Sequence, residues 1–148
     1  MYDSWKAGSR ELVPITPEES RGKAEVILAK VLSNRKPPYS LAGGLFDVLK
    51  ESNGDFYKVS NDQIVYWMLQ FFNKEGYDIL PAAACAVAAL KNALEDGVVK
   101  RDETVMLNIT GAGMLNATSK GFEMKKPDLI LSTDLSAEEV IASVDRLF

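Results

Sequence analysis

Residues 105–113 are the part of this chain best suited to binding a ligand. An apolar run, 105–109, ends in Thr110, which is followed by Gly111, Ala112 and Gly113. Because a glycine carries no Cβ and tolerates positive φ, the backbone there can approach a flat ligand closely. In α/β proteins, ligands bind where strands end. We therefore expect Thr110 and the three residues after it to line a ligand site at the tip of a buried strand.

Composition restricts the other chemistry that this chain can carry. Its 148 residues include no histidine and one cysteine, Cys85. The lack of histidine excludes Ser-His and Cys-His catalytic pairs, and the acidic residues are dispersed, so no metal site is expected. Cys85 stands among alanines and is expected to pack rather than react, and a single thiol fits a reducing cytoplasm. A net charge of −4 argues against a nucleic-acid partner, and no apolar run is long enough to span a membrane.

The rest of the chain alternates predicted helices with predicted strands, which is typical of an α/β domain. Capping boxes predict that helices start after Thr16, Ser60 and Ser136, the first continuing to about Leu32. Other helices are expected within 41–49, 81–94 and 111–122. Short strands are expected at 56–59, 104–109 and 129–131.

Two of these helices are expected to supply the core. The helix after Ser60 carries one broad apolar stripe, formed by Ile64, Val65, Trp67, Met68, Phe71 and Phe72. The helix that Pro81 begins and Gly97 ends is rich in small residues, namely Ala82, Ala83, Ala84, Ala86, Ala88 and Ala89. Such a helix is either a tightly packed central helix or the wall of a cofactor pocket. Residues 120–127, with three lysines, a glycine and a proline, are the expected surface linker.

Longer motifs resemble a known family. Residues 2–12 and 31–40 resemble the late part of threonine synthase-type enzymes, and 31–40 is similar to the cysteate synthase branch. The order of the later segments is similar too: strand, helix, the helix that starts with 81–84, strand, and then 110–113. The resemblance covers essentially the whole chain, but only the C-terminal part of such an enzyme.

This resemblance implies a pyridoxal 5′-phosphate (PLP) enzyme with part of the tryptophan synthase β-like fold. That fold is α/β with three αβα layers, in which helices flank a mostly parallel sheet. Residues 1–122 would belong to the PLP-binding catalytic domain, and 123–148 would form a strand-helix extension packed on it. Cysteate synthases replace the phosphate of O-phosphoserine with sulfite on the route to coenzyme M. Threonine synthases act on phosphohomoserine, so a threonine synthase fragment is the alternative.

The resemblance also implies roles for individual residues. Thr110 matches the hydroxyl residue that faces the pyridine nitrogen of PLP, although such a hydroxyl could instead cap the following turn. Gly111, Ala112 and Gly113 would line the ring beside it. On the substrate side, Arg35 could bind phosphate or sulfite or be an ordinary surface charge. The other substrate-binding candidates are Asn34, Tyr39, Ser40 and, more weakly, Lys36.

The sequence also departs from the family pattern. The lysine that holds PLP covalently and the glycine-rich phosphate loop occur earlier in the family than Met1 of this chain, so no catalytic residue is expected here. Leu80 stands where the family often has a carboxylate. We therefore expect a C-terminal fragment that is inactive alone and that self-associates or pairs with an N-terminal catalytic portion. The alternatives are a non-catalytic module that completes a partner chain, or a remnant that binds nothing.

Overall fold

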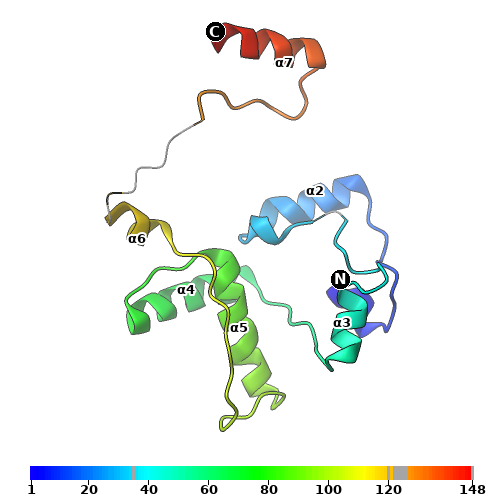
Figure 1. Cartoon of the computed structure of the whole chain (residues 1–148), viewed down its shortest axis with the longest axis vertical. Coiled ribbons are helices and arrows are strands. Elements are labelled where there is room, and N and C mark those ends of the chain that lie inside the picture. Colours follow the sequence, from blue (N-terminus) through cyan, green and yellow to red (C-terminus); the bar gives the residue numbers. More distant parts are fainter. Residues whose placement is uncertain (35, 120, 122–126, 148) are drawn as a thin grey trace.

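The computed structural model describes residues 1–34, 36–119, 121 and 127–147. Figure 1 shows that the ordered elements in this part of the chain are all helices. In chain order they are α1 (Tyr2–Lys6), α2 (Pro17–Val26), η1 (Lys30–Leu32), α3 (Leu45–Glu51), α4 (Asn61–Glu75), α5 (Pro81–Glu95), α6 (Met114–Ser119), α7 (Ala137–Val144) and η2 (Asp145–Leu147). No helix in the described ranges is both long and apolar enough to cross a membrane.

The three capping boxes predicted from the sequence are confirmed. The side chains of Thr16, Ser60 and Ser136 each accept the backbone N–H of the residue three positions later, and that residue's side chain accepts the N–H of the cap. Each box pairs two donors that a helix start otherwise leaves without a partner. α7 therefore begins where it was predicted, and η2 follows it directly.

The first of these helices is shorter than predicted, because α2 ends at Val26 instead of near Leu32. Asn61 explains where it ends. The amide of Asn61 donates to the carbonyl of Val26 at 2.7 Å, and its Oδ1 accepts the N–H of Leu28 at 3.0 Å. These bonds hold the chain in an extended conformation at Ile27 and attach the end of α2 to the start of α4.

α4 and α5 pack against each other and form the main core. The residues buried there are Ala29, Ile64, Ile79, Ala83 and Ala84, with Ala88 and Ala93 buried further along α5. Short side chains let the two helices approach closely. Cys85 packs against the same cluster, and burial raises the pKa of its thiol. This agrees with a packing role for Cys85.

The broad stripe of α4 is only partly core. Ile64 is buried, and Met68 and Phe71 pack against the cluster. The expectation that the aromatic residues are core is wrong for Phe72, which is 45% exposed, and Val65 on the same stripe is 47% exposed. α4 packs against α5 along one side, so a stripe this broad is not covered within the described part of the chain.

A second apolar cluster, which the sequence did not predict, joins α1 to α3. The rings of Trp5 and Tyr39 meet Phe46 edge-on at centroid distances of 5.6 and 5.7 Å. Phe56 lies 6.2 Å from both rings. Edge-to-face pairs at these distances are favourable beyond simple burial. Tyr39 is completely buried by this packing.

The predicted sheet is not formed in the described residues. No strand forms in the segments 56–59, 104–109 and 129–131. The β-pairing in the described residues is one isolated antiparallel bridge between Ile79 and Ala112. A strand needs neighbouring strands to take its backbone hydrogen bonds. Residues 104–110 make no backbone–backbone hydrogen bond within the described part of the chain. The linker predicted at 120–127 and the domain boundary at 122/123 fall almost wholly outside the described residues.

Candidate functional site

The candidate cofactor element, residues 110–113, is paired through its last three residues with the segment that leads into α5. The N–H of Leu80 donates to the carbonyl of Gly111 at 3.0 Å, and the N–H of Gly113 donates to the carbonyl of Asp78 at 2.8 Å. A carboxylate oxygen of Asp78 also accepts the N–H of Leu115 at 2.7 Å, in the first turn of α6. The element is thus held from both sides, by the start of α5 and by the start of α6.

Gly111 and Gly113 lie close to a segment of their own chain, which the sequence did not predict. Neither residue has positive φ. A Cβ on Gly113 would overlap the carboxylate of Asp78, and one on Gly111 would meet the side chain of Leu80 at 3.1 Å. The close neighbour is therefore the 78–80 segment of the same chain. Leu80, at the position where the family often has a carboxylate, packs against the element instead of presenting a charge to it.

Thr110 lies on the open side of the extended segment. Along 106–110 the side chains alternate: Met106, Asn108 and Thr110 are exposed, while Leu107 and Ile109 are partly buried. Ile109 packs against the α4–α5 core. Because successive side chains of an extended chain face opposite ways, the hydroxyl of Thr110 faces away from that core. Within the described residues it has no hydrogen-bond partner.

A shallow apolar hollow lies on the core side of the same segment. It has a volume of about 230 Å³ and is lined by Phe71, Tyr77, Asp78, Ile79, Ile109 and Ala112. Ala112 belongs both to the lining of this hollow and to the candidate cofactor element. Thr110 does not line the hollow. A ring held by Thr110 would therefore lie on the opposite, open face. That face carries the exposed hydroxyl of Thr110, which has no hydrogen-bond partner among the described residues.

The structure separates the substrate-binding candidates. Asn34 is exposed and lines a surface hollow. Arg35 lies outside the described residues. Tyr39 is completely buried, and its hydroxyl donates to the carbonyl of Ser9 at 2.8 Å. Ser40 donates its hydroxyl to the carbonyl of Arg10 at 2.7 Å. Tyr39 and Ser40 thus have partners within the chain, and Asn34 keeps an accessible side chain.

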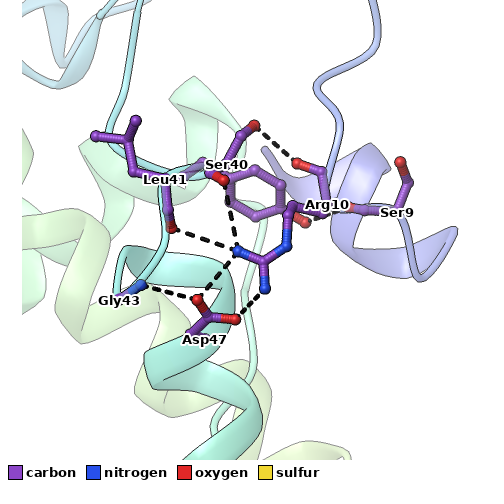
Figure 2. Close-up of polar contacts among 7 residues, drawn as sticks. Ser9, Arg10, Ser40, Leu41, Gly43 and Asp47 are labelled. Carbon is purple, nitrogen blue, oxygen red and sulfur yellow. Dashed lines mark hydrogen bonds and ion pairs between the residues drawn. The ribbon is translucent and has the colours of Figure 1, made fainter.

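Arg10, which sequence reasoning did not select, organises the loop that carries these candidates (Figure 2). Its guanidinium donates to the carbonyls of Ser40 and Leu41, each at 3.4 Å, and to both carboxylate oxygens of Asp47 in α3. The N–H of Gly43 also donates to Asp47, at 2.9 Å. The hydrogen bond from Arg10, followed by that from Gly43, lowers the pKa of the Asp47 carboxyl. No local pattern signalled this network, because its members lie far apart in the sequence.

The described residues give little support for a metal site or for a nucleophilic lysine. In the part of the chain that the structure describes, no three His, Cys, Asp or Glu side chains are grouped to hold a metal ion. Lys91 pairs with Glu95 along α5 at 3.0 Å. Lys6 pairs with Asp55 at 2.6 Å, and this hydrogen bond raises the pKa of the lysine. A raised pKa keeps a lysine protonated, so Lys6 does not have the character of a nucleophile.

Comparisons with known proteins identify the family. Residues 1–111 match the family described as "Pyridoxal-phosphate dependent enzyme". The chain is 45% identical to a cysteate synthase of Methanocella paludicola over 115 residues, which are 77% of this chain and 27% of that protein. It is 36% identical to a cysteate synthase of Methanosarcina mazei over 143 residues, 95% of this chain and 34% of that protein. No solved structure gives a significant match. The chain spans about a third or less of these curated relatives, and it belongs to the family of pyridoxal-phosphate dependent enzymes.

Proposed function

We propose that this chain supplies the C-terminal part of a cysteate synthase-like enzyme, and that it is inactive alone. The complete enzyme would replace the phosphate of O-phosphoserine with sulfite, giving cysteate and phosphate. The observation that carries the proposal is the similarity to several cysteate synthases, at 36–45% identity for the two relatives above. The family implies PLP as cofactor and the tryptophan synthase β-like fold.

Thr110 is the residue we assign to the cofactor. When bound, PLP supplies the electron sink that allows a bond at the β-carbon of an amino acid to break. The role of Thr110 is to meet the ring nitrogen with a neutral hydroxyl, which does not hold that nitrogen protonated as an aspartate would. Gly111, Ala112 and Gly113 would line the ring beside it. The exposed, unpartnered hydroxyl supports this assignment.

The unpaired segment 104–110 supports the need for a second portion. Its backbone lacks hydrogen-bond partners within the described residues, and Met106 is 86% exposed. An extended segment with free N–H and carbonyl groups on an apolar surface is a template for another strand. The strands that would complete the sheet would come from the portion of the enzyme that this chain does not match.

The decisive experiment pairs the 148-residue chain with the part of the Methanosarcina mazei enzyme that it does not match. Formation of cysteate, with release of phosphate from O-phosphoserine, should require both portions, PLP and sulfite. Release from phosphohomoserine, with formation of threonine, would support the threonine synthase alternative. A stable complex without any turnover would favour a non-catalytic module. Turnover by the 148-residue chain alone would refute the proposed division of the enzyme.

A further inference from the structure

Two surface hollows meet on one side of α2. The larger, of about 450 Å³, lies between α2 and a set of residues that includes 12–16, Asn34 and Pro37. The smaller, of about 390 Å³, lies further along the helix. The linings of both include Ile15, Ser20, Arg21 and Asn34. We name the combined depression, defined by these four residues, the α2 groove.

The charge of the α2 groove is set by Arg21. Among the described residues that line the larger hollow, none carries a carboxylate, and the charged side chain is that of Arg21. Lys6 and Arg10, two other cations near the N-terminus, are neutralised by Asp55 and Asp47. Arg21 is exposed and, among the described residues, has neither an ion pair nor a hydrogen bond. In the smaller hollow the positive charge of Lys23 is accompanied by Glu25. The larger hollow is thus the more positive of the two.

Two further donors flank Arg21. Asn34 accepts the N–H of Lys36 on its Oδ1 at 2.9 Å, which leaves its two amide hydrogens without a partner in the described structure. The hydroxyl of Ser20 has no hydrogen-bond partner there either. A guanidinium, an amide NH2 group and a hydroxyl are the donors that bind phosphate and similar oxyanions. Residues 12–15 form an apolar wall beside these donors.

We propose that the α2 groove binds an oxyanion through Arg21, Ser20 and Asn34. The guanidinium supplies two parallel N–H donors, and the hydroxyl and the amide complete the contacts. The identity of the natural ligand rests on the proposed function, in which the substrate phosphate, the released phosphate and sulfite are all oxyanions. The site itself needs no PLP and no second portion of the enzyme.

Calorimetric titration of the 148-residue chain with inorganic phosphate, at constant ionic strength in chloride, tests the site. Saturable binding is expected. Arg21→Gln should weaken it about tenfold or more, because a charge-assisted hydrogen bond is lost. Arg21→Lys, which keeps the charge without the planar fork, should lie between wild type and Arg21→Gln. The matched control is Arg101→Gln, an exposed arginine outside the groove, which should bind as wild type does.

Two results of this titration would overturn the proposal, and two others would identify the natural ligand. No saturable binding by the wild type, or an equal loss in Arg101→Gln, overturns the proposal. Far-UV circular dichroism verifies that each variant keeps the wild-type helix content. O-Phosphoserine that binds more tightly than phosphate assigns the site to the substrate, whereas equal affinities assign it to the released phosphate; both support the groove. The proposed function is tested separately by sulfite-dependent turnover of the paired portions, so either idea can fail alone.

Discussion

Arg10 and Asp47 form a two-pronged ion pair across 37 residues of sequence. Both terminal nitrogens of the guanidinium donate to the carboxylate, and the same guanidinium lies over the ring of Phe46 with its Cζ 4.8 Å from the centroid. The pair ties the segment after α1 to α3 and fixes the loop that precedes α3. That loop carries Tyr39 and Ser40, whose side chains close the network from the other side.

The first prediction concerns Asp47→Asn. The pKa of Asp47 is lowered from its ordinary value of 3.8 when the protein is folded. The carboxylate therefore stabilises the folded state above about that pH, and this contribution disappears as the pH falls through the lowered value. Asp47→Asn should lower the melting temperature at pH 7, and the difference from wild type should shrink in acid. Thermal unfolding followed between pH 7 and pH 3 measures this, and a difference that is independent of pH would contradict it.

Gly113→Ala should disrupt the candidate cofactor element. The added methyl group overlaps the carboxylate of Asp78, so the pairing with the 78–80 segment must shift. A loss of about 1–3 kcal/mol in the free energy of unfolding is expected. Gly22→Ala is the matched control, because Gly22 lies inside α2 with open space around it. Alanine should stabilise that helix by up to about 1 kcal/mol. Urea denaturation compares the two, and equal effects would argue against close packing at 113.

A neighbouring pair on α4 tests the core. Ile64 is 3% exposed and Val65 is 47% exposed. Ile64→Ala should reduce the free energy of unfolding by about 2–5 kcal/mol, because it leaves a cavity against α5. Val65→Ala should cost less than about 1 kcal/mol. Urea denaturation of both variants measures the difference, and the reverse order would show that α4 packs through its other side.

The 148-residue chain should not hold PLP covalently. Its lysines include Lys6 and Lys91, which are paired with carboxylates, and none occurs in the sequence context of the family's cofactor lysine. After incubation with PLP and reduction with borohydride, peptide mass spectrometry should find no strongly modified lysine. Stoichiometric labelling of one lysine would show that the chain carries a cofactor-binding lysine of its own.

Local signals predicted the helix starts but not the distant contacts. Thr16, Ser60 and Ser136 were found because a capping box lies within four consecutive residues. The predicted end of α2 near Leu32 is wrong, because the helix ends where the side chain of Asn61, 35 residues further along the chain, bonds to Val26. The Arg10–Asp47 ion pair cannot be predicted from a local pattern either, because its members are 37 positions apart.

The predicted strands fail in a different way. The segment 104–109 has the composition and the alternating exposure of a strand, yet strand pairing depends on neighbours that the described residues do not provide. In the candidate site, Thr110 and its two glycines could be selected from the sequence. The close approach of Asp78 and Leu80 to these glycines could not be predicted, because the contacting residues are about 30 positions earlier in the chain.

The central claim is that the hydroxyl of Thr110 meets the ring nitrogen of PLP in the complete enzyme. The most direct measurement is turnover by the paired portions carrying Thr110→Ser, Thr110→Val or Thr110→Asp, with Thr104→Val, at the exposed start of the same segment, as control. Thr110→Ser should retain most activity, whereas Val and Asp should each lower kcat about tenfold or more while PLP remains bound. Thr104→Val should behave as wild type. Full activity of Thr110→Val would contradict the account.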